Sequence, residues 1–272
     1  GRLTPFVGRE REIGVLLDRW QRALEGSGQI VLVTGAAGIG KSRLILALRE
    51  GLVRHPHTWL ECRGSPYTRA SPFHPTIELL EQGLAFSPRD TSEEKLRKLE
   101  RGIERAGFDA RDALFAISRL LDLPVAEAGD GEPSFPGLLR ERTIETLSAW
   151  ILALSLDQPV VLFVEDVHWL DPSSLDLLGH LFARIPSARV LALLTARSEF
   201  GMPWKQAATF VPIDSLARRE ARELVEVVAG AGRLAPDAIE RIVDRGDGVP
   251  LFLEELAQAA LHSEAEGAPL AI

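Results

Sequence analysis

Cysteine and methionine each occur only once in the 272 residues. A single cysteine, Cys62, excludes a disulfide within the chain, which is typical of a protein from a reducing compartment. The single methionine is Met202. We therefore expect that Gly1 is not a native start and that the sequence is a piece of a larger protein.

Long apolar runs and blocks of basic residues are also missing. The longest apolar candidate, 147–156, is interrupted by two serines, whereas a membrane-spanning helix needs about 20 mostly apolar residues. No export signal opens the chain, so we expect a cytoplasmic location and no membrane contact. The net charge is −8, with both signs interspersed. Because nucleic-acid binding needs a basic surface, we expect no direct nucleic-acid binding.

The composition that remains, 46% hydrophobic and 26% charged, is that of a globular protein long enough to bury a core. Short apolar runs that fit buried strands of a parallel sheet alternate at first with helical patterns. The expected fold class is therefore α/β, with a parallel sheet flanked by helices. Strands are predicted at 30–34, 58–63, 160–164, 190–195 and 209–213.

Helical patterns depart from this alternation in two places. Between about 72 and 135 several helices occur without a strand, which predicts a helical insertion ending in a loop over 124–136. Thr91 and Glu94 have the spacing of a capping box at one helix start, and Asp171 before a proline predicts an N-cap. After residue 214 all patterns are helical. We predict a sheet domain over 1–214 and a small all-helical lid domain over 215–272.

One segment between a predicted strand and a predicted helix matches the phosphate-loop pattern G-x-x-x-x-G-K-[ST]. Glycines let backbone N–H groups face phosphate oxygens, and the following helix directs its positive end to the anion. The lysine reaches the β- and γ-phosphates, and the serine hydroxyl binds Mg²⁺. The chain is thus predicted to be a P-loop NTPase. The nucleotide-binding residues expected here are Gly35, Ala36, Ala37, Gly38, Ile39, Gly40, Lys41, Ser42 and the adjacent Arg43.

Two carboxylates end the predicted strand 160–164, at the sheet edge where α/β proteins bind ligands. Hydrolysis of ATP needs a carboxylate at the metal and another at the attacking water. The usual order begins with aspartate, whereas this chain has Glu165 and then Asp166. We assign Glu165, together with Ser42, to the metal ion. Asp166 is assigned to the attacking water and also contributes to the metal site. With Lys41 they form the predicted catalytic set.

Thr195 and Arg197 follow the next predicted strand, where a polar pair could sense the γ-phosphate. Arg197 is the fourth predicted catalytic residue, and capping a helix or pairing with a surface acid are its alternatives. His168 is interpreted as a packing residue. Arg184 and Arg189 flank a predicted helix end; either could reach the phosphate of a neighbouring copy, although Arg184 is expected to cap the helix.

Several segments occur in an order that resembles the signal-transduction ATPases with numerous domains, the STAND branch of AAA-like P-loop proteins. They are Val7-Gly8-Arg9-Glu10, the phosphate loop, Glu165 to Asp171, Thr195-Ala196-Arg197 and Gly248 to Phe252. Two further segments, Cys62 to Tyr67 and Pro72 to Pro75, resemble ATPase modules fused to bacterial class III adenylate or guanylate cyclases; related modules are fused to kinases and LuxR-type regulators.

The resemblance implies further roles. Val7, Gly8 and Arg9 lie near the adenine base, Pro250 covers the adenine or ribose, and Arg197 acts as a sensor arginine. It also implies slow turnover of ATP to ADP, a fused effector domain and nucleotide-dependent self-association. Because no guanine-reading N/T-K-x-D motif is present, ATP is the expected nucleotide.

Three functions fit these expectations. The first is an Mg-ATP-binding, slowly hydrolysing regulatory switch within a larger multidomain signalling protein. The second is a nucleotide-binding scaffold or interaction module with little or no turnover. The third is a kinase for a small molecule, although the sequence shows no acceptor site.

Overall fold

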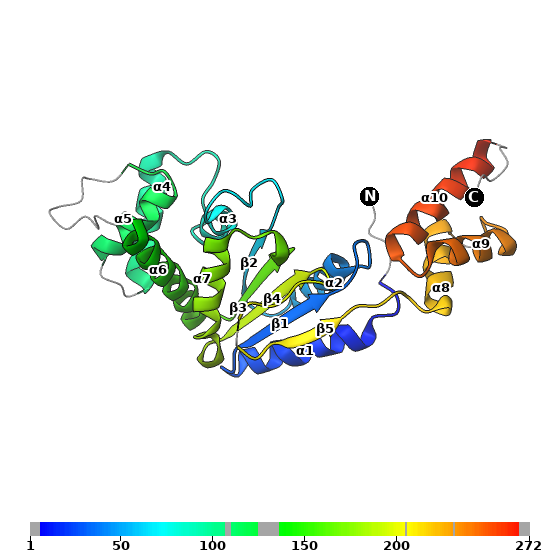
Figure 1. Cartoon of the computed structure of the whole chain (residues 1–272), viewed down its shortest axis with the longest axis horizontal. Coiled ribbons are helices and arrows are strands. Elements are labelled where there is room, and N and C mark those ends of the chain that lie inside the picture. Colours follow the sequence, from blue (N-terminus) through cyan, green and yellow to red (C-terminus); the bar gives the residue numbers. More distant parts are fainter. Residues whose placement is uncertain (1–5, 107–109, 125–135, 205, 231, 267–272) are drawn as a thin grey trace.

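The computed structural model describes residues 6–106, 110–124, 136–204, 206–230 and 232–266. The interior of the predicted loop 124–136 lies outside these residues. So do the first residues of the predicted sheet domain and the last residues of the predicted lid domain. Figure 1 shows the sheet in the middle of the molecule, the insertion helices at one end and the C-terminal helices at the other. Within the described part of the chain, no helix is both long and apolar enough to cross a membrane.

The sheet has five parallel strands in the order β2-β3-β4-β1-β5, which confirms the predicted fold class. The strand before the phosphate loop, β1, is separated from the acid-bearing strand β3 by β4. Because all pairings are parallel, the carboxyl ends of the five strands lie at the same edge of the sheet. The strands are β1 (Gln29–Thr34), β2 (Thr58–Arg63), β3 (Val160–Glu165), β4 (Val190–Ala196) and β5 (Thr209–Pro212).

Both faces of the sheet are covered, which explains why its strands are apolar almost throughout. Alternate residues of β1 enter different cores: Val31 and Val33 face one, while Ile30 and Leu32 face the other. The first core is closed by α1 (Glu10–Leu24) and α2 (Lys41–Leu52). The second is closed by α3 (His74–Gly83), α6 (Pro136–Asp157) and α7 (Pro172–Phe182). Burying each such aliphatic side chain contributes roughly 1.5–3 kcal/mol.

The insertion adds α4 (Ser92–Ala106) and α5 (Ala110–Leu120), which pack on α6. The predicted capping box is confirmed: the Glu94 N–H donates to Thr91 Oγ1 at 3.2 Å, and the Thr91 N–H donates to Glu94 Oε2 at 2.8 Å. It satisfies two N–H groups that a helix start would otherwise leave unpaired.

Asp171 is the N-cap of α7, as predicted. Its buried carboxylate accepts from the N–H groups of Ser173 and Ser174 at 2.9 and 3.0 Å, and from the Phe73 N–H at 3.2 Å. One side chain therefore both starts α7 and anchors the loop before α3.

Two short 3₁₀ helices were not predicted, namely η1 (Val167–Trp169) and η2 (Ile185–Ser187). The capping of the α7 end by Arg184 stays a prediction. Arg189 instead closes a different helix, because it donates to the carbonyls of Ser155 and Leu156 at the end of α6.

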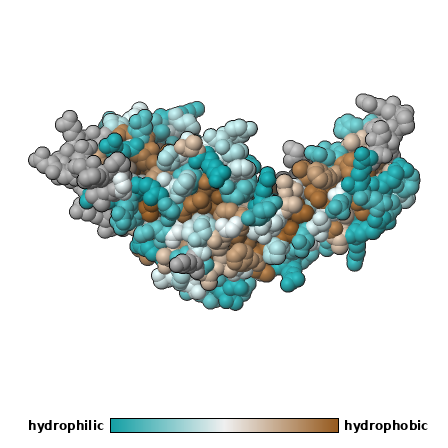
Figure 2. All heavy atoms as spheres, viewed as in Figure 1, coloured by the Kyte–Doolittle hydropathy of each residue, from teal (hydrophilic) through white to brown (hydrophobic). Residues whose placement is uncertain are grey.

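The C-terminal helices, called the lid below, are α8 (Arg218–Ala229), α9 (Pro236–Gly246) and α10 (Pro250–Glu266). It has a core of its own that includes Leu224, Ile242 and Leu253. Ile213 still belongs to a sheet core, whereas Leu216 belongs to the lid core. Figure 2 shows hydrophilic residues along the outer side of the lid. The opposite side of the lid faces the sheet domain.

Candidate functional site

A cleft of about 470 Å³ opens where the carboxyl edge of the sheet meets the lid. Both domains contribute to its walls. Residues far apart in the sequence therefore converge on one volume large enough for a small ligand. The residues predicted from the sequence that line it are Val7, Arg9, Ala37, Gly38, Ile39, Gly40, Lys41, Ser42, Arg43, Glu165, Asp166, Arg197 and Pro250.

The phosphate loop has the backbone that its glycines allow. Gly38 and Gly40 have φ values of +74° and +101°, which L side chains rarely adopt. Gly40 is the N-cap of α2, and no side chain caps that helix start within the described residues. The first N–H groups of α2 and its positive dipole end therefore face the cleft, an arrangement that binds anions.

Lys41 is the first residue of α2, and its ammonium folds back over the loop. Its Nζ donates to the carbonyl oxygens of Gly35 at 2.9 Å and Ala36 at 2.8 Å. Burial lowers the pKa of Lys41; Asp166 opposes this shift and Arg197 reinforces it. A phosphate beside Nζ would favour the charged form, so binding an anion and keeping the lysine protonated support each other.

Glu165 and Asp166, called the acidic turn below, lie directly against α2. The Ser42 hydroxyl donates to Oε1 of Glu165, which places Glu165, the residue assigned to the metal, beside the predicted metal-binding hydroxyl. Asp166 adopts a left-handed conformation with φ +54°. Its backbone N–H donates to Thr195 Oγ1 at 2.9 Å. Thr195 is fully buried, so its hydroxyl orients the acidic turn instead of facing a phosphate.

This set of oxygen donors fits Mg²⁺, which prefers one or two carboxylates together with phosphate and water oxygens. Ser42, Glu165 and Asp166 would hold the ion, which would neutralise charge on the phosphates when bound. In the described part of the chain, no group of three or more His, Cys, Asp or Glu side chains forms a metal cluster. The remaining ligands would therefore come from nucleotide and water.

Arg197 lies at the rim of the cleft, just beyond β4. Its guanidinium carbon is 5.9 Å from the centre of the Trp169 ring, a cation–π arrangement. The His168 ring packs beside Trp169, with ring centres 5.1 Å apart. Both His168 nitrogens are buried and, among the described residues, have no hydrogen-bond partner. Burial lowers the pKa of His168, which agrees with its interpretation as a packing residue.

The segment before α1 ties the sheet domain to the lid. The buried Arg9 donates to the Asp214 carbonyl at the start of the connection to α8. Gly8 has φ +69°, and a Cβ there would lie 2.6 Å from Cδ of Glu220 in α8. The positive φ favours glycine, and a larger residue would also displace the Glu220 side chain. The segment predicted to lie near adenine thus also forms part of the joint between the two domains.

The lid reaches the phosphate loop through the first turn of α10. The Leu251 N–H donates to the Gly38 carbonyl at 3.3 Å. Pro250, the residue predicted to cover the nucleotide, is the first residue of that helix and lines the cleft. A movement of the lid would therefore alter the phosphate loop directly.

Residues 5–194 match a family described as the AAA ATPase domain. The chain belongs to this AAA ATPase domain family. The family assignment supports nucleotide binding and ATPase activity in general, and it matches the phosphate loop and acidic turn found at the cleft.

Solved AAA-like structures have the same fold over nearly the whole chain. The ORC1 protein of Aeropyrum pernix, determined in complex with DNA, has 18% identity and a TM-score of 0.53, covering 97% of this chain and 62% of that one. A STAND protein with a tetratricopeptide repeat sensor from Pyrococcus horikoshii has 16% identity and a TM-score of 0.50. That match covers 98% of this chain and 33% of the other.

An uncharacterized protein of Rhizobium meliloti is 31% identical to the AAA ATPase chain over 258 residues. The match covers 93% of this chain but 25% of that protein. The chain therefore spans about a quarter of the length of this relative.

Some site residues differ from the sequence-based expectation. Gly8, Gly35 and Ala36 do not line the cleft, although Gly35 and Ala36 hold Lys41 through their carbonyls. Arg63 and Leu251 line it without having been predicted to do so. Both residues lie in segments that carried the STAND resemblance, but the resemblance gave neither of them a role.

Proposed function

We propose that the chain is an Mg-ATP-binding, slowly hydrolysing regulatory switch within a larger multidomain signalling protein. The observation that carries this proposal is the cleft itself, because its walls come from the phosphate loop, the acidic turn and the first turn of α10. A nucleotide held there touches both domains. It can bias the docking of the lid only through different affinities for the docked and undocked states.

Loss of the γ-phosphate would supply such a difference. Lys41 and Arg197 are the cations assigned to the phosphates, and their contacts change between ATP and ADP. Glu165 is assigned to the metal because its carboxylate touches Ser42, and Asp166 to the attacking water. Val7, Arg9 and Pro250 are assigned to the base and ribose, since they line the same cleft from the domain joint. Gly8 is assigned there with its two neighbours, although it does not itself line the cleft. Ile39 within the phosphate loop and Arg43 directly after it complete the lining of the pocket.

Turnover separates a switch from a nucleotide-binding scaffold. We expect slow, steady ADP release from the wild type and its loss in Glu165→Gln and Asp166→Asn. The exposed Glu100→Gln on α4 serves as the matched control. Binding that survives in all variants, with no turnover in the wild type, would favour the scaffold.

Shape is the second test. Small-angle X-ray scattering should distinguish the form without nucleotide from the ADP-bound and ATP-analogue-bound forms, because the lid docks on the phosphate loop through α10. Identical profiles for the three forms would contradict a conformational switch in this chain.

The surroundings of the module are also part of the proposal. A fused cyclase, kinase or DNA-binding effector would receive the signal in the cytoplasm, and self-association would depend on nucleotide. The Aeropyrum ORC1 structure was determined with DNA, whereas this chain has a net charge of −8, and we propose that it makes no direct contact with nucleic acid. Analytical ultracentrifugation with ADP and with an ATP analogue tests the self-association.

A further inference from the structure

Arg63 is the last residue of β2, and the sheet itself places it beside the acidic turn. In the parallel pairing of β2 with β3, Arg63 is the partner of Glu165. Its Nε lies 3.5 Å from Glu165 Oε2, and its Nη2 lies 3.4 Å from Asp166 Oδ2. One guanidinium thus spans both carboxylates that we assign to the metal and the attacking water.

The backbone around this contact is closely fixed. The Gly64 N–H donates to the Glu165 carbonyl at 2.8 Å. A Cβ on Gly64 would lie 2.4 Å from the Asp166 carbonyl oxygen, so no larger residue fits. The base of the Arg63 side chain is therefore held in place. Its side chain is nevertheless 68% exposed, which leaves the guanidinium free to turn within the cleft that it lines.

The two oxygens of Glu165 have different partners: Oε1 accepts from Ser42 and Oε2 faces Arg63. A metal ion shared by Ser42 and Glu165 would bring a second cation to the same carboxylate. Because like charges repel at this range, the ion would weaken the contact between Arg63 and Glu165 without supplying Arg63 with a new partner. A guanidinium binds phosphate oxygens through paired N–H groups, so the terminal phosphate of a nucleotide in this cleft would offer Arg63 an alternative partner.

We propose that Arg63 recognises the terminal phosphate of ATP and rests on Glu165 and Asp166 when that phosphate is absent. This inference deepens the proposed function and rests on Mg-ATP binding in this cleft. ADP offers no γ-phosphate, so Arg63 stays on the acidic pair in the ADP state. The other two cations assigned to the phosphates have different resting partners, since Lys41 lies on loop carbonyls and Arg197 on the Trp169 ring.

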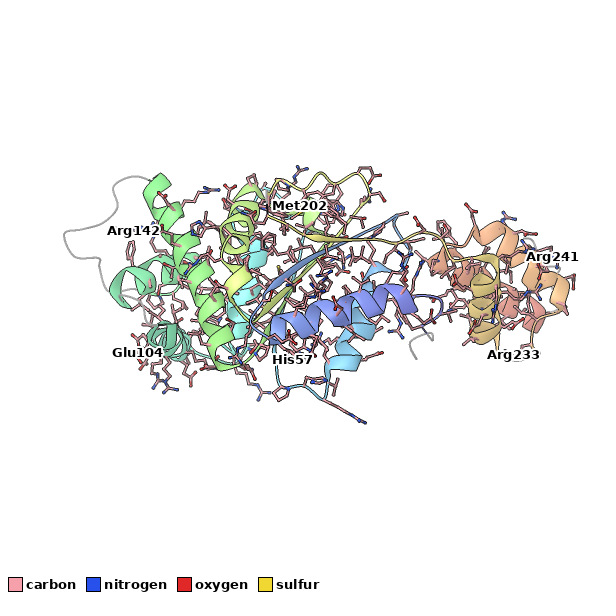
Figure 3. The ribbon with its side chains drawn as sticks, turned by 90° about the horizontal axis from the view of Figure 1, so that it is seen from below. His57, Glu104, Arg142, Met202, Arg233 and Arg241 are labelled. Atoms are coloured by element: carbon pink, nitrogen blue, oxygen red, sulfur yellow. The ribbon has the colours of Figure 1, made fainter. Side chains whose placement is uncertain are left out.

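Equilibrium binding tests the proposal without relying on turnover. The dissociation constants of ADP and of AMP-PNP, a non-hydrolysable ATP analogue, are measured in Mg²⁺ for the wild type, Arg63→Ala and Arg63→Lys. Arg241→Ala is the matched control: Arg241 pairs with Asp237 on the lid and lies away from the sheet domain in Figure 3. We expect Arg63→Ala to weaken AMP-PNP binding about tenfold to a hundredfold and to change ADP binding less than about twofold.

The conservative variant tests the geometry. Arg63→Lys keeps the charge but loses the planar pair of donors, so we expect an intermediate loss of AMP-PNP affinity. Thermal unfolding without ligand verifies that each variant is folded, and Arg63→Gln replaces Arg63→Ala if the alanine variant is not.

Two results would overturn the inference while leaving nucleotide binding intact. One is an unchanged ratio of AMP-PNP to ADP affinity in Arg63→Ala. The other is tighter binding of both nucleotides, which would make Arg63 only a competitor for the acidic pair. A wild type that binds neither nucleotide would instead overturn the proposed function, and this inference with it.

Discussion

The backbone N–H of Leu251 in α10 donates to the carbonyl of Gly38 in the phosphate loop, at 3.3 Å. A Cβ added to Gly38 would lie 3.0 Å from Cβ of Leu251. The lid helix therefore rests directly on the loop backbone, with no room for a side chain between them. This contact is the physical link through which nucleotide and lid position can influence each other.

Gly38→Ala should break this link. The substitution forces a side chain into φ +74° and against α10, so we expect a loss of about 1–3 kcal/mol in the free energy of unfolding. Nucleotide affinity should fall as well, because both the loop and the lid are displaced. Urea unfolding and nucleotide titration measure the two effects.

Gly14→Ala is its control. Gly14 lies within α1 with no atom within 4 Å of an added Cβ. Alanine should therefore stabilise the protein by about 0.5–1 kcal/mol through helix propensity, with nucleotide affinity unchanged. Equal effects of the two substitutions would contradict a specific contact at Gly38.

Thr195→Val tests the support of the acidic turn. The substitution keeps the shape of a fully buried residue but removes the acceptor of the Asp166 N–H. Because the Asp166 N–H is only partly buried, leaving it unpaired should cost about 1 kcal/mol, and ATP turnover should fall because Asp166 loses its orientation. Thr143→Val is the comparison, since the Thr143 hydroxyl donates to the Leu139 carbonyl within its own helix. A similar response of both variants would refute the orienting role.

Cys62 gives a pH prediction. Burial raises the pKa of the Cys62 thiol well above its ordinary value. Below about pH 8.5 the thiol is neutral in both the folded and unfolded states. Above it only the unfolded state loses the proton, so the stability contributed by Cys62 decreases as pH rises.

The buried position of Cys62 also predicts its reactivity. We expect no reaction of the native protein with a thiol reagent at pH 8 and reaction of one thiol in urea. Rapid modification of the native protein would contradict the buried position.

Local patterns predicted much of this molecule because each reflects neighbouring residues. Thr91 and Glu94 cap their helix at the predicted spacing, and Asp171 caps α7 as its position before a proline indicates. Apolar runs indicated strands covered on both faces. The phosphate loop followed from glycines whose positive φ values allow the turn at Gly38 and Gly40.

Contacts between distant segments could not be predicted in this way. Arg63 meets the acidic turn only because β2 pairs with β3 in one register. Leu251 meets the loop only because the lid docks there. Thr195 was read as a phosphate sensor because its position at a strand end was visible, whereas its buried hydrogen bond to Asp166 depends on the order of β3 and β4. Such relationships depend on tertiary packing, which sequence spacing does not encode.

Thermal unfolding with nucleotide tests the central claim that Mg-ATP binds in this cleft. Wild type and Lys41→Ala are compared with ATP, ADP or GTP in Mg²⁺, and nucleotide released from the denatured protein is measured in parallel. At 100 times the dissociation constant, ATP or ADP should stabilise the wild type by about 2.7 kcal/mol, GTP should not, and Lys41→Ala should lose the effect. An unchanged unfolding temperature in wild type that carries no copurified nucleotide would contradict the account.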